Sequence, residues 1–339
     1  MTGLFEAIRR LWAGRFQAVA LVFLGLVATT AVLADCLASD LPIVTRYHGT
    51  FYVLPNMFRP GALRRLDNQT IARTMAKSDW ALYPLIRYGP NETMPGGSLS
   101  PYAHPGRPHL LGTDDVGRDV AAQLIHGSRT ALVVGGLSVL IYSLIALLLG
   151  AAAGYLGGVV DRAVAWAVAV LLTFPTLLLI LAFQAVTGSG SLWTLVAIIG
   201  LSGWAGPARL VRAEVMAVKA RPHVLAARAA GAGHLRLLAV HILPEAVTPL
   251  LVSATFGVAW AILAESAVSF LGLGGGYASW GRLLAAGRTD LSAWWLVSFA
   301  GIALVLTVLS VGALADGIQD LAGAGRSSYR RAPDAAFHL

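Results

Sequence analysis

Long uncharged, apolar runs dominate this chain and predict helices that cross a membrane. About 20 apolar residues span the roughly 30 Å of hydrocarbon in a bilayer. Runs without Asp, Glu, Lys or Arg cover residues 16–34, 130–160, 163–208, 246–264 and 291–315. The third run is too long for one helix, and the letters TGSGS within it are a turn signal. The pattern therefore predicts six spans.

The composition agrees with a chain that lies mostly in lipid. Its 339 residues are 57% hydrophobic and only 12% charged, whereas soluble domains carry about 25% charged residues. The mean hydropathy of +0.70 also excludes a disordered chain, because such chains are poor in hydrophobic residues. The single cysteine, Cys36, allows neither an intramolecular disulfide nor a cysteine-rich metal site.

Positive charges are concentrated next to particular spans and predict the topology. Short loops rich in Lys and Arg stay in the cytoplasm. Such charges flank the first and last spans and crowd the segment 209–245; they are Arg9, Arg10, Arg15, Arg209, Arg212, Lys219, Arg221, Arg228, Arg236, Arg326, Arg330 and Arg331. We therefore expect both termini and this segment in the cytoplasm, and we interpret the net charge of +8 as a topology signal rather than as nucleic-acid binding.

Four regions follow from this topology. Residues 1–37 form a cytoplasmic N-terminus and first span, which is longer than the apolar core of a cleaved signal peptide. Residues 38–128 form an extracytoplasmic insertion, 129–322 a core of five spans, and 323–339 a cytoplasmic tail. Nine of the fifteen prolines lie in the insertion, so we expect only short elements there.

Most of the insertion has few sequence signals for secondary structure, and the end of the insertion has more. Alternating residues at 47–54 predict a short strand, and 71–77 predict a helical turn. At the end, Thr113 is the expected N-cap of an amphipathic helix at the membrane surface, with Asp114 and Asp115 in its first turn. Capping and interfacial anchoring explain these residues; a metal site with the nearby His109 is the alternative.

The segment 209–245 predicts a compact cytoplasmic knob. Pro222 is suited to the first turn of a helix, and Gly231 and Gly233 interrupt that helix. A second helix is expected at 234–243, ending at Pro244. Two short helices with small side chains let a partner's groove approach closely, although an ordinary connection between spans has the same pattern.

Nucleotide binding by this chain is not expected. A P-loop needs glycine immediately before its lysine, but Ala76 precedes Lys77 and Val218 precedes Lys219. These are the two lysines of the chain.

The spans carry no ionisable residue in their interiors, and Asp35 and Glu265 fall at span ends. A proton-coupled secondary transporter needs such groups near the midplane, so this pattern counts against that class. A non-transporting membrane scaffold stays open. Glu265 is either an interfacial residue or a candidate gate, and Pro175 predicts a kinked helix.

Several stretches resemble the permease subunits of bacterial ABC importers for oligopeptides and dipeptides, of the C type. LAARAAG at 225–231 and HILP at 241–244 resemble the EAA coupling motif of that family. HLLGTDDVGRD at 109–119, GYLGG at 154–158 and ESAVSFLGLG at 265–274 resemble its other signatures.

The insertion narrows the resemblance further. SDLPIVTRYHGTFY at 39–52 and WALYPLIRYG at 80–89 are similar to the Yej-type subgroup. That subgroup is associated with importing peptides, including the peptide-nucleotide antibiotic microcin C.

This resemblance implies an all-α membrane protein with the type I ABC importer permease fold, six transmembrane helices and a large insertion between the first two. It implies a transport subunit of the bacterial inner membrane rather than an enzyme. The implied partners are a B-type second permease subunit, a cytoplasmic ABC ATPase that binds the ATP, and an extracytoplasmic peptide-binding protein. No cofactor of its own is expected.

The resemblance also implies two groups of functional residues. The ATPase-coupling contact would consist of Ala226, Ala227, Gly231, Gly233 and Pro244. The extracytoplasmic motif would consist of Gly112, Thr113, Asp114, Gly117, Arg118 and Asp119. Leu225 stands where the family's coupling motif begins with Glu, so we expect a contact that is more apolar, or weaker.

Overall fold

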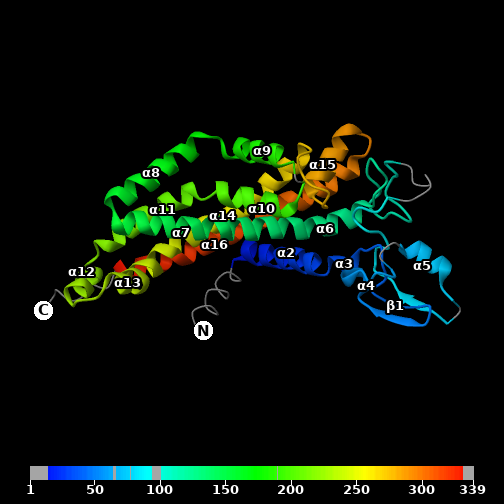
Figure 1. Ribbon diagram of the computed structural model, residues 1–339, viewed down its shortest axis with the longest axis horizontal. Helices are drawn as coiled ribbons and strands as arrows, with labels where there is room; N and C mark the ends of the chain where they lie inside the picture. The colour runs from blue at the N-terminus through cyan, green and yellow to red at the C-terminus, as the bar shows by residue number, and fades with distance from the viewer. Residues whose placement is uncertain (1–13, 64–65, 77, 94–100, 189, 331–339) are drawn as a thin grey trace.

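In the computed structural model, the chain forms an elongated helical bundle with a small sheet-containing unit at one end (Figure 1). The structure describes residues 14–330 except 64–65, 77, 94–100 and 189. The predicted N-terminal segment before residue 14 and the tail after residue 330 lie outside the described residues. We refer to the end of the bundle next to the sheet as the insertion end and to the opposite end as the loop end.

The first two predicted spans are present, and the second is longer than expected. The first is α2 (Arg15–Val32), followed by the short α3 (Ala34–Leu37). The second is α6 (Val120–Val133), a π-helical turn η1 (Val134–Ser138) and α7 (Val139–Leu156), which together form one continuous helix. The prediction of a separate interfacial helix before this span is therefore wrong.

The long run at 163–208 forms two bent pairs of helices. They are α8 (Gly158–Thr173) with α9 (Thr176–Thr187), bent by 82°, and α10 (Leu192–Ser202) with α11 (Ala205–Lys219), bent by 40°. The predicted break between the pairs is confirmed. The expected kink at Pro175 is a full break, because proline cannot donate a helical hydrogen bond and forces Phe174 into an extended conformation.

The remaining helices complete the bundle. A continuous helix consists of α13 (His234–Arg236), the π-helical η2 (Leu237–Ile242) and α14 (Leu243–Phe270), and it is followed by α15 (Trp280–Thr289) and α16 (Trp294–Arg330). The predicted helix end at Pro244 is wrong, because this proline lies in the first turn of α14. Among the described residues, four helices are long and apolar enough to span a membrane, or six spans if each bent pair counts once.

Glycines let two of these helices approach closely. A Cβ atom on Gly150 would lie 2.5 Å from the carbonyl oxygen of Ala208, and one on Gly154 would lie 2.7 Å from that of Arg212. Small residues at such positions are typical of helix packing in membranes. The helices α7 and α11 are therefore in near backbone contact, and this pair forms the rigid centre of the bundle.

The insertion folds around a small antiparallel sheet with strand order β2-β1-β3. Its elements are β1 (Val44–Tyr47), β2 (Thr50–Val53), α4 (Pro55–Phe58), α5 (Asn68–Thr74) and β3 (Trp80–Leu82). The predicted strand at 47–54 corresponds to β2, but its start is wrong, because His48 and Gly49 have positive φ and form the β1–β2 turn. The predicted helical turn is α5, which begins earlier because Asp67 caps it.

Glu92 gives the insertion a predicted pH dependence. Burial raises the pKa of Glu92 to about 7 from 4.5, although its carboxylate accepts a hydrogen bond from the Gly89 N–H. Between these pH values the folded insertion binds a proton that the unfolded chain releases, so stability falls as the pH rises through this window. We expect the thermal unfolding midpoint to fall as the pH rises through this window. Glu92→Gln should make the midpoint less dependent on pH there, and an unchanged dependence would exclude Glu92 as its source.

Candidate functional site

The predicted coupling knob lies at the tip of the loop end (Figure 1). Its helix α12 (Pro222–Ala229) begins at the expected proline. The helix is followed by Gly231, whose φ of +85° is a conformation that favours glycine. Of the implied docking residues, Ala226, Gly231, Gly233 and Pro244 are exposed, whereas Ala227 is half-buried against the core of the bundle. The structure thus places four of the five on an accessible surface.

A set of polar contacts holds α12 against the spans. Arg221, at the N-cap of α12, pairs with Glu245 of α14 and lies 3.7 Å from Glu214 of α11. The His223 Nε2 atom lies 3.1 Å from the same Glu245 carboxylate. These contacts connect the knob to two spans, so a displacement of α12 is transmitted to α11 and α14. Sequence reasoning missed them because the partners lie on different helices, and Arg221 and Glu245 are 24 residues apart.

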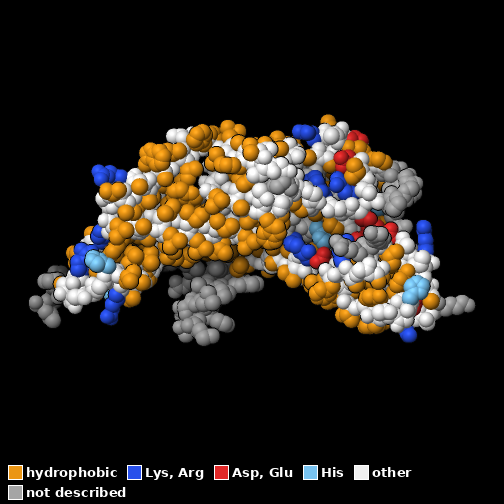
Figure 2. Space-filling view, in the orientation of Figure 1, with side chains coloured by type: hydrophobic (Ala, Val, Ile, Leu, Met, Phe, Trp, Pro, Cys, Tyr) orange, Lys and Arg blue, Asp and Glu red, His pale blue; other side chains and the backbone are white. Residues whose placement is uncertain are grey.

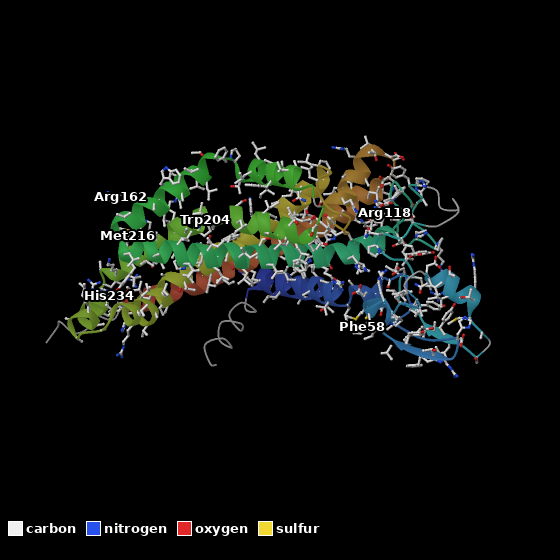
Figure 3. The ribbon with its side chains drawn as sticks, viewed as in Figure 1. Phe58, Arg118, Arg162, Trp204, Met216 and His234 are labelled. Carbon is white, nitrogen blue, oxygen red and sulfur yellow. The ribbon has the colours of Figure 1, made fainter. Side chains whose placement is uncertain are left out.

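A second brace connects the knob to α7. The Tyr155 hydroxyl lies 2.8 Å from His234 Nδ1 at the start of α13. Lys219 Nζ donates to the Tyr155 carbonyl oxygen over 2.6 Å, so this lysine is engaged at a helix end. Figure 3 shows His234 at the tip of the loop end.

The accessible surface of the knob is apolar where the family motif has a carboxylate. Leu225 is 49% exposed beside Ala226, and Leu235 of α13 is 84% exposed. The expectation of a more apolar contact, based on Leu225, stays a prediction because no partner tests it.

The motif at 109–119 lies at the insertion end and forms a clamp rather than the start of a helix. The prediction that Thr113 is the N-cap is wrong: α6 begins at Val120, and Asp119 caps it by accepting from the Ala122 N–H over 2.8 Å. Thr113 instead contacts α16, because its carbonyl oxygen accepts from Trp295 Nε1 over 3.1 Å. A Cβ atom at Gly112, where φ is +80°, would clash with the same tryptophan.

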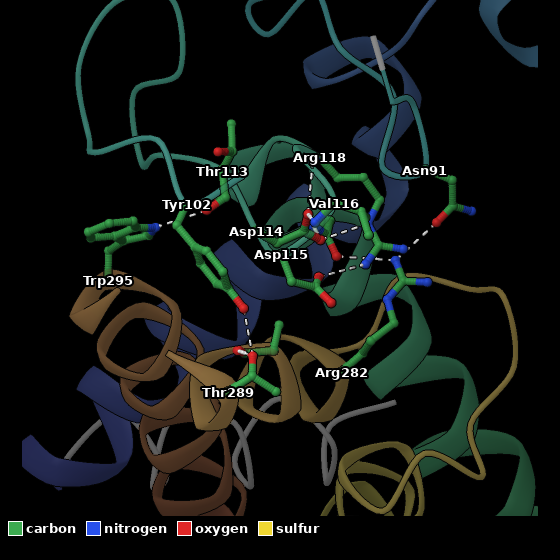
Figure 4. A network of polar contacts seen from close by, with 12 residues as sticks. Asn91, Tyr102, Thr113, Asp114, Asp115, Val116, Arg118, Arg282, Thr289 and Trp295 are labelled. Carbon is green, nitrogen blue, oxygen red and sulfur yellow. Dashed lines mark hydrogen bonds and ion pairs between the residues drawn. The ribbon is translucent and has the colours of Figure 1, made fainter. Parts of the chain in front are cut away.

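Asp114 is the centre of the clamp (Figure 4). Its fully buried carboxylate accepts from Arg118 Nε over 2.6 Å and from Gln123 Nε2 over 2.7 Å. It also accepts from the backbone N–H groups of Arg118 and Val116. Its oxygens are thus occupied by hydrogen bonds that fold the loop, and the left-handed Gly117 allows the turn. The nearby His109 pairs with Asp119 over 2.7 Å.

Arg282 of α15 joins the clamp to the rest of the insertion. Its Nη2 atom donates to Asn91 Oδ1 over 2.9 Å and to Gln123 Oε1 over 3.1 Å. Burial, together with the positive charge of Arg118, lowers the pKa of Arg282 to about 10, so the side chain stays charged at neutral pH. The helix α15, which was not predicted, is therefore connected to the clamp through the contact between Arg282 and Gln123.

Removing the Asp114 carboxylate should loosen the clamp. We expect Asp114→Ala to destabilise the protein by about 3 kcal/mol, because it leaves buried cationic and amide donors without their acceptor. The matched control is Asp115→Ala, since the Asp115 side chain is 40% exposed and lies 3.5 Å from Arg118; such pairs contribute about 1 kcal/mol or less. Thermal unfolding in detergent compares the two, and equal losses would show that Asp114 has no special role.

A half-open pocket of about 230 Å³, which we call the cavity, lies where both bent helix pairs break. Thr176 follows the α8–α9 break, and Gly203 lies at the α10–α11 break. The hydroxyl-bearing residues Tyr142, Thr176, Ser202 and Ser253 are among the residues that line it, together with Trp260, and none of the described lining residues is charged. Broken helices at mid-bundle are typical of transporter binding sites.

Comparison with known proteins assigns the family. Residues 146–326, which include α12, most of the spans and every residue named as lining the cavity except Tyr142, match the binding-protein-dependent transport system inner membrane component family. The chain belongs to this family. It is therefore a multi-pass membrane subunit with the type I ABC permease fold, as its helices indicate.

Relatives of this permease are named for peptide transport. The di/tripeptide transport system permease protein DppC of Pseudomonas aeruginosa is 40% identical over 214 residues, which are 62% of this chain and 70% of that protein. The dipeptide transport system permease protein DppC of Bacillus subtilis is 38% identical over 64% of this chain and 68% of that protein. A putative peptide transport system permease protein of Brucella suis is 37% identical over 71% and 81%. The similarity to the Yej-type subgroup stays a prediction.

Glu265 of the permease is buried among protein side chains. It lies in the last two turns of α14, which ends at Phe270, and it is only 2% exposed. Ser269 Oγ donates to it over 2.7 Å, and Ser266 Oγ lies 3.4 Å away. That no span interior holds an ionisable group therefore stays a prediction, and family membership counts independently against a secondary transporter.

Proposed function

We propose that this chain is the C-type permease subunit of an ATP-driven peptide importer and forms half of its translocation path. The observation that supports this most directly is the similarity to named peptide permeases over 62–71% of the chain. The uncharged, hydroxyl-lined cavity at the two helix breaks is suited to peptide main-chain groups, which are uncharged donors and acceptors.

The proposed energy source is a partner. A cytoplasmic ABC ATPase binds and hydrolyses ATP while docked on α12, a B-type permease subunit encloses the other half of the path, and a binding protein delivers peptide at the insertion end. In support, α12 is accessible and is braced to α11 and α14, and the adjoining α13 is braced to α7, so closure of the ATPase would move the walls of the cavity. A conformational change of this kind needs contacts that differ between the two states.

The proposed orientation puts the loop end in the cytoplasm and the insertion outside, in the bacterial inner membrane. In support, the short segment 209–245 at the loop end carries six Lys and Arg residues; Figure 2 shows Lys and Arg side chains there and also at the insertion end. A cysteine at the exposed His48, in a Cys36→Ser background, should react with an impermeant reagent in intact cells. Labelling only after permeabilisation would reverse the topology. Asn68 is unsuitable for the probe, because its buried side chain donates to Ser39 and Arg87 carbonyl oxygens.

Reconstitution tests the proposed function. The chain is co-expressed with a second permease subunit and an ABC ATPase from the same operon, purified by a tag on this chain, and placed in proteoliposomes with the binding protein. We expect co-purification and uptake of labelled di- or tripeptides that depends on ATP. Co-purification without uptake of any peptide that the binding protein retains would favour the non-transporting scaffold.

A further inference from the structure

The two faces of the insertion sheet are different. The register places Thr45 opposite Tyr52 and Ala81, and this face packs on a small core that includes Leu41 and Ile71. Cross-strand partners share a face, so the opposite face is defined by the alternate positions. It consists of Val44, Arg46, Phe51, Val53, Trp80 and Leu82. We call these six residues the open face.

The open face is apolar and uncovered. Phe51 is 56% exposed and Leu82 is 56% exposed, and the rings of Phe51 and Trp80 pack edge to face with centroids 5.8 Å apart. Arg46, which the register places between these rings, is its one charged residue. A contiguous apolar surface of this kind marks a contact with another apolar phase or protein.

Neighbouring segments extend this surface towards the bundle. In α4, which directly follows β2, Phe58 is 75% exposed and Met57 is also exposed. Leu85 is exposed and precedes Ile86, whose N–H donates to the Leu37 carbonyl oxygen over 2.9 Å. Figure 3 shows Phe58 at the edge of the insertion nearest the end of α2.

Polar contacts fix the level of α4 relative to the membrane. Asp35 of α3 forms a partly buried ion pair with Arg129 of α6 over 2.8 Å, and charged side chains that are still in part open to the surroundings belong at the headgroups rather than in hydrocarbon. Asn56 of α4 donates to the Asp35 carbonyl oxygen over 2.6 Å. Met57 and Phe58 therefore lie at the depth where the first span leaves the bilayer.

We propose that the open face together with Met57, Phe58 and Leu85 is an interfacial membrane anchor, resting in the headgroup region of the leaflet on the insertion side. Figure 2 shows hydrophobic side chains along the edge of the insertion next to the apolar surface of the spans. Lipid is the occupant that this continuity favours, because the same bilayer already covers the exposed end of α2, where Val32 and Leu33 are exposed.

The dimensions and the chemistry fit this environment. The interfacial layer is roughly 6 Å thick on each side of the hydrocarbon. The Phe51–Arg46–Trp80 row is two residues from the Val53–Val44–Leu82 row, about 7 Å along the strands. The Val53–Val44–Leu82 row, which is nearer α4, thus lies in the interfacial layer. The Phe51–Arg46–Trp80 row lies at the surface of that layer, where aromatic rings are favoured and where Arg46 can reach a lipid phosphate.

Spin-label accessibility tests the anchor. Single cysteines at Phe58 and Leu82 are introduced into the full-length Cys36→Ser chain, labelled, and measured in nanodiscs of phosphatidylethanolamine and phosphatidylglycerol. We expect both labels to relax faster with oxygen, which concentrates in lipid, than with a water-soluble nickel chelate. The matched control is a cysteine at His48, an exposed turn residue at the far end of the sheet, where the order of the two reagents should be reversed.

Two results would overturn the proposal. If the labels at 58 and 82 respond to the nickel chelate as the label at 48 does, the face is in water. If both labels are shielded from both reagents only in the assembled importer, a partner protein covers the face. Neither result depends on whether the cargo is a peptide, so the anchor and the proposed transport function fail separately.

Discussion

Cells that express the Ala226→Glu chain should insert it at normal levels and lose most of their peptide uptake. Ala226 is exposed on α12 beside the exposed Leu225, in the surface that we propose as the ATPase contact. A carboxylate placed in an apolar contact without a partner costs several kcal/mol. Since 1.4 kcal/mol is tenfold in affinity, docking should weaken by about 100-fold.

The structure makes Ala226 a better test position than Gly231. Most side chains at Gly231 are strained because its φ is +85°, so a loss of uptake in Gly231→Glu would combine backbone strain with lost docking. Gly231→Asn separates the two effects, because Asn tolerates left-handed backbone better than other side chains and carries no charge.

Ala226→Ser is the size-matched control and should keep uptake near the wild-type rate. Uptake and ATPase co-purification are measured together with membrane abundance. Wild-type uptake by Ala226→Glu at equal abundance would remove α12 from the coupling contact.

Hydropathy predicted the spans because lipid imposes one simple requirement. The run 16–34 differs from α2 by no more than two residues at each end, since in hydrocarbon a helix is the element that satisfies all of its own backbone groups. The same reasoning missed α15, whose Arg282 and Arg288 interrupt the apolar pattern. That helix is positioned by the clamp contacts of Arg282 with Asn91 and Gln123, which no local pattern reveals.

Local capping rules predicted the wrong start for α6, because the side chains that could cap a helix there make tertiary contacts instead. Thr113 and the two acidic residues after it fit a helix start, yet Arg118 and Gln123 recruit Asp114 into a folded loop. The helix therefore begins six residues later than predicted, where Asp119 caps it. The clamp was thus recognised as a motif from the sequence, but its role in holding the insertion to α15 and α16 became visible only from its contacts.

The cavity could not be predicted from the sequence for a related reason. Tyr142 and Gly257 lie on different spans, and a Cβ at Gly257 would lie about 1.5 Å from the Tyr142 hydroxyl. The phenol therefore packs directly against the backbone of α14. Pairings of this kind between distant spans leave no pattern in the sequence. The helix break next to the cavity does leave a signal, which is Pro175 itself.

Filling this cavity should block transport without releasing the ATPase. Gly206 lines it, and a Cβ built there meets no heavy atom within 4 Å. Gly206→Leu therefore places an apolar side chain in the proposed path without a clash. Replacing a helical glycine also favours folding by about 0.5–1 kcal/mol. We expect uptake to fall about tenfold or more, since a loss of only 1.4 kcal/mol of cargo binding has that effect.

The matched control is Gly25→Leu, the same change on an exposed position of α2 where a Cβ also meets no neighbour. It should leave uptake unchanged. The ATPase should co-purify with Gly206→Leu but not with Ala226→Glu, because one variant obstructs the cargo and the other removes the dock. If Gly206→Leu is as stable as the control and transports peptide at the wild-type rate, the cavity lies outside the path. The path would then have to run along a surface that this subunit shares with its partner.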